Sequence, residues 1–354
     1  MRILFLADAK SYHTQRWVDY FVGCGYQCYL ITLDRGLETK AEEFIIPSLV
    51  LPNFLKYPLS LHRVKEVISR IKPDLINAHY IPSYGFIGAR LKFHPLVVST
   101  WGSDVLISPH KSWLHKQRTK YVLKKADLVT TDARFTGEAI LKLGVDIGKV
   151  VVSPMGVERN LFGPVVRAEK PYLTILSNRK LESLYDVPTL LKAIPLTTKE
   201  AKRRVKFVIL GEGSRKKDLV ILAKELGIED SLEFKGTVSR EMLIQYYRDA
   251  DIYVSTSRSD STSVSLLEAM SFGLIPVVTD IPGNKEWIDH QKNGFLFPRS
   301  DHESLARQIV YIINEFNGWS FFRVKNQSII HQRGTWEDNM KVIEAKFRQL
   351  IDKN

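Results

Sequence analysis

The sequence predicts an α/β protein of two Rossmann-like domains, each built on a mostly parallel sheet with helices on both faces. Short apolar runs of strand length alternate with amphipathic stretches of helix length along most of the 354 residues, which is typical of parallel βα units. The alternation pauses once, at the charged, proline-containing stretch 165–171. We therefore predict domains at 1–167 and 168–335 that face an interdomain cleft, with ligands at the carboxyl ends of the strands.

In the N-terminal half, each apolar run is followed by a stretch with apolar residues at helical spacing. We expect strands at 2–8, 26–33, 73–80, 94–102, 126–132 and 149–156. We expect helices at 14–25, 61–71, 84–93, 111–125 and 135–144.

The C-terminal half repeats the same alternation. We expect strands at 172–178, 205–213, 232–236, 251–257 and 275–280. We expect helices at 188–194, 219–227, 241–250 and 265–273, and a charged amphipathic helix at 336–354.

The composition is that of a soluble globular protein, with 44% hydrophobic and 25% charged residues. No apolar run approaches the roughly 18–20 residues that span a bilayer, and the N-terminus reads as a first strand rather than a signal peptide. Cys24 and Cys28 make neither a disulfide framework nor a complete zinc site. We expect free thiols in a reducing, cytoplasmic location.

The positive charge is uneven, which bears on the partners of the protein. Of the net charge of +12, nine units fall within residues 1–167, which favours an anionic partner there. Residues 109–125 hold six Lys and Arg and no acid, interleaved with aromatic and aliphatic residues. Such a helix can lie on an anionic membrane surface, or it can be a solvated helix with one packed face. We find no nucleic-acid-binding motif and expect no nucleic acid partner.

A helix after the strand at 251–257 carries an unusual pair of acids. Thr262 or Ser263 is a suitable N-cap and Gly273 a suitable stop, so the helix begins close to Val264. Its free backbone N–H groups, at Ser263, Val264 and Ser265, favour an anion such as a diphosphate.

Asp260 lies just before that helix and Glu268 lies inside its apolar part. A buried carboxylate needs strong hydrogen-bond donors, and paired ribose hydroxyls are suitable ones. The alternative is a partly exposed Glu268 on a surface helix.

Gly211 and Gly213 come directly after the apolar run 205–210 of the strand expected at 205–213. Glycines there allow the backbone to approach a phosphate. The full dinucleotide fingerprint needs a third glycine where Lys216 stands, although Glu233 mimics its ribose-binding acid. The two glycines can therefore be interpreted as part of a site for a nucleotide other than NAD, or as a plain tight turn.

The sequence around these residues resembles that of the family 4 glycosyltransferases, also known as glycosyl transferases group 1. Asp260 and Glu268 match the E-x7-E motif of that family, with Asp in place of the first Glu. The resemblance covers nearly the whole chain. It extends to the stretches at 99–105, 153–162, 211–213, 235–239 (which includes Val238) and 263–297.

The resemblance implies a GT-B architecture, in which the N-terminal domain binds the acceptor and the C-terminal domain binds a nucleotide sugar. The family retains the anomeric configuration and uses no bound metal or other cofactor. By the matched positions, Glu268 binds the ribose hydroxyls and Asp260 contacts the donor sugar. The final helix, with Trp336 near its start, is expected to cross back onto the N-terminal domain.

A phosphate clamp is also implied by the resemblance. Arg179 matches the phosphate-binding Arg of the family, whereas Leu184 stands where many members have a Lys. Lys180, an N-domain cation or the helix N-terminus could supply the missing charge to the leaving group. The alternative for Arg179 is a solvated surface cation.

Four residues are candidates in the N-terminal domain. Trp101 stands where many members carry a His that contacts the donor sugar, and an indole can stack on a sugar face but cannot act as acid or base. We expect Asp104 to reach a sugar hydroxyl, and His79 to contribute a polar group or serve a structural role. His13 in the first βα loop is expected near the phosphates or the acceptor.

The resemblance thus implies a metal-independent retaining glycosyltransferase, a hexosyltransferase-like enzyme that we expect in the cytoplasm and peripheral to the membrane. It would transfer a sugar from a nucleotide-sugar donor to a hydroxyl of a glycan or lipid-linked acceptor, for a surface polysaccharide or glycoconjugate. The alternatives are a nucleotide-sugar epimerase of the same fold and a non-catalytic protein that binds sugar nucleotides or glycans.

Overall fold

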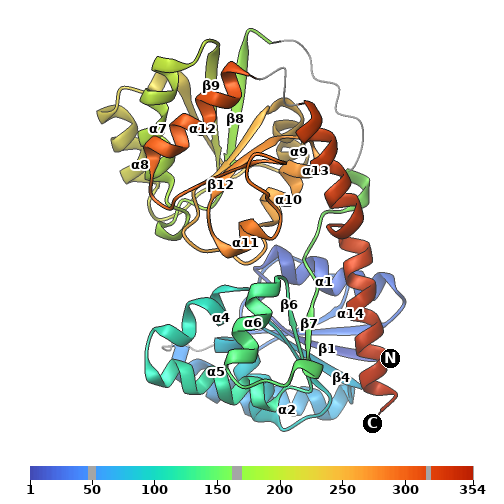
Figure 1. Ribbon diagram of the computed structural model, residues 1–354. Helices are drawn as coiled ribbons and strands as arrows, with labels where there is room; N and C mark the ends of the chain where they lie inside the picture. The colour runs from blue at the N-terminus through green and yellow to red at the C-terminus, as the bar shows by residue number, and fades with distance from the viewer. Residues whose placement is uncertain (47–52, 162–169, 316–319, 354) are drawn as a thin grey trace. The chain divides into compact units, whose positions relative to one another are not determined.

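The chain forms two compact units in a computed structural model that describes residues 1–46, 53–161, 170–315 and 320–353 (Figure 1). One unit comprises Met1–Pro154 and Asp338–Asn354, and the other comprises Met155–Glu337. We call them unit 1 and unit 2. The predicted domain boundary at 167/168 lies outside the described residues.

Unit 1 contains a seven-stranded sheet in the order β3-β2-β1-β4-β5-β6-β7, and every neighbouring pair is parallel. The strands are β1 (Arg2–Leu6), β2 (Gln27–Thr32), β3 (Glu42–Ile45), β4 (Leu75–His79), β5 (Leu96–Ser99), β6 (Leu128–Thr131) and β7 (Val150–Val152). The sequence did not predict β3, because this charged edge strand lacks the apolar run that marks the others.

The helices of unit 1 follow the predicted order with changed bounds and include one short helix, Ser103–Leu106, that the sequence did not predict. They are α1 (Tyr12–Gly23), α2 (Asn53–Ile71), α3 (Phe86–Leu91), α4 (Ser103–Leu106), α5 (Trp113–Lys125), α6 (Arg134–Lys142) and α14 (Trp336–Ile351). The helix expected at 84–93 is shorter, because a π-helical turn occupies Tyr80–Gly85 before α3. The side chain of Ser112 caps α5 by accepting from the backbone N–H of His115.

Helix α14 packs on α1 within unit 1. The ring of Phe347 is fully buried and stacks on Phe21, with centroids 5.0 Å apart and planes at 6°. Glu344 accepts hydrogen bonds from the hydroxyls of Tyr26 (2.6 Å) and Tyr20 (3.2 Å). An aromatic stack and a bonded carboxylate therefore fix the C-terminal helix on the first helix of the chain.

Unit 2 contains a six-stranded sheet in the order β10-β9-β8-β11-β12-β13, again with parallel neighbours. The strands are β8 (Tyr172–Asn178), β9 (Arg204–Leu210), β10 (Leu232–Gly236), β11 (Ile252–Ser255), β12 (Ile275–Thr279) and β13 (Phe295–Phe297). The prediction of two parallel α/β sheets is thereby confirmed.

The helices of unit 2 include three that the sequence did not predict, α11, α12 and α13. The set is α7 (Val187–Glu200), α8 (Lys216–Glu225), α9 (Arg240–Asp249), α10 (Val264–Ser271), α11 (Pro282–Lys285), α12 (His302–Asn314) and α13 (Ser320–Arg333). Ser263 is the N-cap of α10, as predicted, and accepts from the N–H of Leu266. Gly273 follows α10 with a φ of 69°, the left-handed conformation that glycine favours at a helix end.

Within the described part of the chain, no helix is both long and apolar enough to cross a bilayer.

A buried polar chain runs across the carboxyl ends of β4, β5 and β6. The amide of Asn77 donates to Ser99 Oγ (2.9 Å), and Thr130 donates to the same hydroxyl (2.9 Å). The amide oxygen of Asn77 faces His79 Nε2 at 2.9 Å, so this nitrogen carries the proton. Burial, with the neighbouring His13, lowers the pKa of His79 to about 3, and the ring is neutral at physiological pH.

This buried neutral histidine makes the stability of the protein depend on acidity. In the unfolded chain a histidine binds its proton near pH 6.5, whereas folded His79 binds it near pH 3, so acid favours unfolding between these values. We predict that the difference in unfolding free energy between wild type and His79→Gln falls by roughly 2–3 kcal/mol from pH 7.5 to pH 4.5. Urea titrations at several pH values measure this difference, and a constant difference would contradict the assignment.

Candidate functional site

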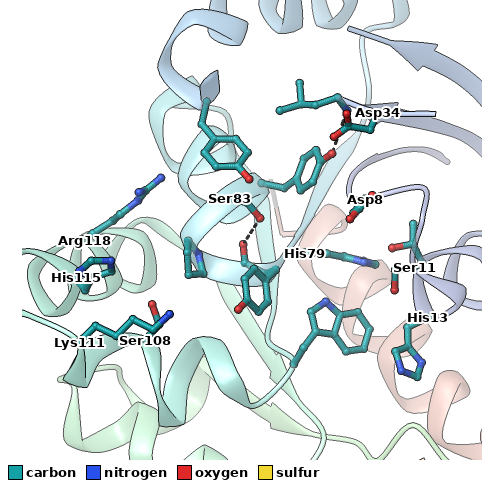
Figure 2. Close-up of a pocket in the computed structure, with 17 residues that line it drawn as sticks. Asp8, Ser11, His13, Asp34, His79, Ser83, Ser108, Lys111, His115 and Arg118 are labelled. Atoms are coloured by element: carbon teal, nitrogen blue, oxygen red, sulfur yellow. Dashed lines mark hydrogen bonds between the residues drawn. The ribbon is translucent and has the colours of Figure 1, made fainter. Parts of the chain in front are cut away.

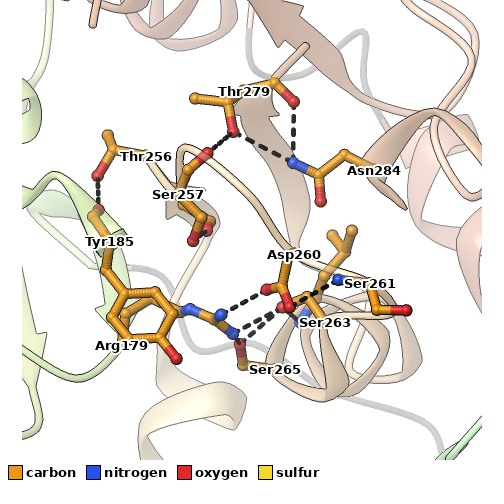
Figure 3. Close-up of polar contacts among 12 residues, drawn as sticks. Arg179, Tyr185, Thr256, Ser257, Asp260, Ser261, Ser263, Ser265, Thr279 and Asn284 are labelled. Atoms are coloured by element: carbon orange, nitrogen blue, oxygen red, sulfur yellow. Dashed lines mark hydrogen bonds and ion pairs between the residues drawn. The ribbon is translucent and has the colours of Figure 1, made fainter. Parts of the chain in front are cut away.

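Arg179 follows β8 directly and lies beside the loop that leads into α10 (Figure 3). Its Nη1 donates to Ser263 Oγ and to Ser265 Oγ, each at 2.8 Å, and its Nη2 pairs with the carboxylate of Asp260. The guanidinium also lies over the ring of Tyr185, 4.5 Å from the centroid. The side chain is only 11% exposed, so the alternative of a solvated surface cation is wrong.

Burial and charge act in opposite directions on this guanidinium. Burial by itself lowers the pKa of Arg179, but Asp260, followed by Tyr253 and Tyr185, raises it above its ordinary value. A buried cation is tolerated when it is paired and hydrogen-bonded in this way.

Glu268 lies one turn inside α10 and is only 5% exposed, so the alternative of a partly exposed surface glutamate is wrong. Its Oε1 accepts from Arg240 Nη1 at 2.6 Å, and its Oε2 accepts from the hydroxyl of Tyr247 at 2.9 Å. Asn178, at the end of β8, donates to the same tyrosine hydroxyl at 2.8 Å. The carboxylate is therefore fully bonded at the carboxyl edge of the sheet.

Arg240 was not among the residues that the sequence predicted. It is the first residue of α9, after the capping Ser239. A cation in the first turn of a helix opposes the helix dipole, so an arginine there suggests a second role. That signal was available in the sequence, but it does not identify Glu268 as the partner.

Gly211 and Gly213 lie against the loop that carries Arg179. A Cβ atom on Gly211 would come 2.5 Å from the carbonyl oxygen of Arg179, and one on Gly213 would come 2.3 Å from that of Leu181. These glycines allow two loops to touch through their backbones and so set the position of Arg179. Their predicted contact with a phosphate stays a prediction.

Other predicted donor-site residues surround this centre. Val238 packs against the core beneath α10, Val264 is half-buried at the start of that helix, and Lys180 is exposed. The carbonyl of Leu184 accepts from the backbone N–H of Arg258 at 2.9 Å. Leu184 thus anchors the loop that leads to Asp260.

A third glycine holds the same loop from the other side. A Cβ atom on Gly283, in α11, would come 1.9 Å from the carbonyl oxygen of Ser261, so only glycine fits. The side-chain amide of the adjacent Asn284 donates to the carbonyl oxygen of Thr279 (2.8 Å). The hydroxyl of Thr279 donates to the carbonyl oxygen of Ser257 (2.6 Å). These contacts fix both ends of the loop that bears Asp260 (Figure 3).

In unit 1, three predicted residues form one aromatic cluster (Figure 2). The ring of His13 stacks on Trp101 with centroids 5.6 Å apart, and Trp101 meets His79 edge-on at 5.2 Å. The ring of Trp17 contacts both Trp101 and His79. Because the lowered pKa of His79 makes its ring a weak base and Trp101 does not titrate, neither supplies a strong base.

Asp104 does not reach the place predicted for it. It is fully buried, and its two oxygens accept from the backbone N–H groups of Trp101 (2.9 Å) and Ile81 (3.1 Å). Burial raises the pKa of Asp104 to about 6, against the opposite effect of those N–H groups. The prediction that it contacts a sugar hydroxyl is therefore corrected: Asp104 holds the backbone behind Trp101.

A cavity of about 580 Å³ opens in unit 1 beside this cluster (Figure 2). His13, His79 and Trp101 line it, as do eight other titratable side chains that the sequence analysis did not single out. These are Asp8, Asp34, Tyr57, Tyr80, Tyr84, Lys111, His115 and Arg118. Asp8 and Asp34 follow the ends of β1 and β2, where side chains of a parallel sheet converge, so that rule could have found them.

Two protein families match the chain. The family described as Glycosyl transferases group 1 matches residues 159–317, and Glycosyl transferase 4-like matches residues 2–133. Together they cover most of both units.

Curated relatives carry related names. Sulfoquinovosyl transferase SQD2 of Arabidopsis thaliana is 26% identical over 85% of this chain. The putative colanic acid biosynthesis glycosyltransferase WcaL of Escherichia coli K12 is 26% identical over 69% of it. The chain spans 63% and 62% of the lengths of these two relatives. An Escherichia coli enzyme named UDP-Gal:alpha-D-GlcNAc-diphosphoundecaprenol alpha-1,3-galactosyltransferase is 24% identical over 79% of this chain and 76% of its own.

Solved structures share the fold over their whole length. Sucrose-phosphate synthase from Thermosynechococcus elongatus aligns with a TM-score of 0.86 at 17% identity, covering 100% of both chains. Anabaena Alr3699/HepE in complex with UDP-glucose aligns with a TM-score of 0.82 at 19% identity, covering 99% of this chain and 100% of its own. With two parallel sheets of the GT-B type and two matching family descriptions, the chain belongs to the group 1, family 4-like glycosyltransferases.

Proposed function

We propose that the protein transfers a sugar from a nucleotide-sugar donor, bound in unit 2, to a hydroxyl of a glycan or lipid-linked acceptor. The observation that carries this proposal is the buried Glu268, fully bonded by Arg240 and Tyr247 one turn inside α10. Asp260, eight residues before Glu268, forms a second ion pair with Arg179 at the N-terminus of the same helix. A nucleoside diphosphate carries ribose hydroxyls, which can donate to Glu268, and phosphates, which can pair with Arg179.

Glu268 would bind the ribose. Two vicinal hydroxyls can donate one hydrogen bond to each carboxylate oxygen, and each oxygen can accept more than one bond, so only Arg240 would have to be replaced. Arg240, whose side chain is 29% exposed, is the partner that can move aside toward solvent. Tyr247 is 1% exposed and would stay in place.

Arg179 and the N-terminus of α10 would hold the diphosphate. A phosphate oxygen is a stronger partner for a guanidinium than a serine hydroxyl, because it carries charge and can accept two parallel bonds. As Arg179 turns to the phosphate, the carboxylate of Asp260 becomes available for the hydroxyls of the donor sugar. The negative charge that develops on the leaving group would be stabilised by Arg179 and the helix dipole, and the proposal therefore includes no metal.

We propose a front-face displacement with retention of configuration. The bond from the anomeric carbon to the acceptor oxygen forms on the face from which the diphosphate leaves. A leaving phosphate oxygen takes the proton of the acceptor hydroxyl, which accords with the absence of a strong base among His79, Trp101 and the fully buried Asp104. The nucleoside diphosphate departs with that proton.

The names of similar proteins support the choice of substrates. Structures of Anabaena Alr3699/HepE contain UDP and UDP-glucose, and the named galactosyltransferase of Escherichia coli uses UDP-Gal and a diphosphoundecaprenol-linked acceptor. Two relatives are named for colanic acid and amylovoran biosynthesis. We infer a role in the synthesis of a surface polysaccharide or glycoconjugate.

We also propose that α5 brings the protein to the cytoplasmic, anionic face of a membrane. Trp113 and Leu114, at the start of this basic helix, are 69% and 70% exposed. Exposed apolar side chains beside lysines are typical of a helix that lies at a lipid interface.

We predict that one of UDP, GDP and ADP raises the melting temperature of the protein. At 100 times its dissociation constant, a ligand adds about 2.7 kcal/mol of stability, which amounts to several degrees. Glu268→Gln should lose most of this shift, because it removes the charge that accepts from the ribose, whereas Glu225→Gln on the exposed face of α8 should keep it. No shift from any of the three at millimolar concentration would overturn the donor site.

We predict that Arg179→Gln lowers kcat/KM for sugar transfer by at least about 100-fold, the typical effect of removing one charge-stabilising donor. Lys224→Gln, an exposed cation on α8, serves as the matched control and should stay within about twofold. NMR of the glycosylated product should show the anomeric configuration of the donor. Inverted product, or release of an altered sugar without any acceptor, would refute the proposed reaction.

A further inference from the structure

The cavity of unit 1 has two chemically different ends (Figure 2). Asp8, Asp34 and neutral His79 offer hydrogen-bond acceptors at one end. Lys111, His115 and Arg118 lie at the other end, on and just before α5. A ligand that fits both ends must carry hydroxyl groups on one side and negative charge on the other.

Arg118 is the most telling residue at the basic end. Its guanidinium stacks on the ring of Phe86, 4.1 Å from the centroid, and its buried Nε has no hydrogen-bond partner. No carboxylate pairs with it among the residues that the structure describes. A half-buried guanidinium with an unused donor, held flat by an aromatic ring, is preorganised for a planar or tetrahedral oxyanion.

His79 provides an independent observation at the other end. It is 2% exposed, and because Nε2 donates to Asn77, its Nδ1 is an acceptor that has no partner. A buried acceptor without a donor is costly. A hydroxyl group of a ligand in this cavity could donate the hydrogen bond that Nδ1 of His79 lacks.

We propose that this cavity is the acceptor site and takes a sugar that carries a phosphate ester, with its hydroxyls toward Asp8, Asp34 and His79 and its phosphate toward Lys111, His115 and Arg118. This inference rests on the proposed function and specifies its acceptor. A neutral glycan would leave the three basic side chains without a counter-charge, whereas a phosphate forms charge-assisted hydrogen bonds with them.

The phosphate can come from two sources that share this chemistry, a soluble sugar 1-phosphate or a sugar linked through phosphate to a lipid. The exposed Trp113 and Leu114 lie on the same helix as His115 and Arg118. The experiment therefore has one arm for the phosphate and a second arm for its source.

The first arm is calorimetry of the full chain with α-D-glucose 1-phosphate and N-acetyl-α-D-glucosamine 1-phosphate, compared with the methyl α-glycosides of the same sugars. At least one phosphate should bind ten times more tightly than its methyl glycoside. Arg118→Gln should abolish this preference. Lys120→Gln, an exposed cation on the same helix that does not line the cavity, should keep the affinity within twofold, and so should Arg179→Gln.

Equal affinity in Arg118→Gln and wild type would overturn the inference, as would loss of binding in Arg179→Gln, which would place the anion in unit 2. Where Arg118→Gln does not fold, Lys111→Gln with His115→Gln, both exposed, must show the same loss. The nucleoside diphosphate shift is measured on the same preparations. If that shift persists while the phosphate preference is absent, the acceptor inference fails and the proposed function stands.

The second arm compares transfer to sugar 1-phosphates in solution with transfer to polyprenyl-diphosphate-linked sugars in phosphatidylglycerol–phosphatidylethanolamine vesicles. Transfer to the vesicle-bound acceptors that is reduced in Trp113→Ala assigns the lipid-linked source. Transfer to the soluble phosphates without transfer to the vesicle-bound acceptors assigns the free sugar phosphate. Transfer to neither, with transfer to the uncharged methyl glycosides, would overturn the inference.

Discussion

The ion pair between Arg179 and Asp260 is the interaction on which the candidate site of unit 2 depends. Both charges lie at the carboxyl edge of the sheet, where the guanidinium is only 11% exposed. Moving such charges out of water is costly, and the cost is offset only when the geometry is good and further hydrogen bonds form. Ser263 and Ser265 supply those bonds. Gly211, Gly213 and Gly283 allow the surrounding loops to approach closely enough to hold the pair in place.

Glu268, one turn inside α10, is a second buried charge that is held by hydrogen-bonding partners. Glu268 has Arg240 and Tyr247 as partners, and Tyr247 is in turn held by Asn178. In the proposed function, each charge exchanges a protein partner for a group of the donor: Glu268 takes ribose hydroxyls, and Arg179 takes phosphate. Each charged side chain would therefore have a hydrogen-bonding partner both before and after the donor binds, and Asp260 would become available to the sugar only when the diphosphate engages Arg179.

Much of this arrangement could be predicted from the sequence. Apolar runs identified the buried strands, and the cap at Ser263 and the stop at Gly273 located α10 closely, because these signals are local. The resemblance to a family pointed to Asp260, Glu268 and Arg179. Pairings between distant segments were out of reach, since neither the bond from Arg240 to Glu268 nor the burial of Asp104 leaves a local pattern. The edge strand β3 and the π-helical turn at Tyr80–Gly85 were missed for the same reason.

The exchange of partners at Arg179 is the central claim, and the affinity for a nucleoside diphosphate tests it directly. The measurement is the dissociation constant, by calorimetry, of the nucleoside diphosphate that stabilises the wild type, in Asp260→Asn, Arg179→Gln and the double variant. Removing the competing carboxylate should free the guanidinium, so Asp260→Asn should bind several-fold more tightly than wild type. The gain should vanish in the double variant. Unchanged or weaker binding in Asp260→Asn, or a gain that persists without Arg179, would contradict the account.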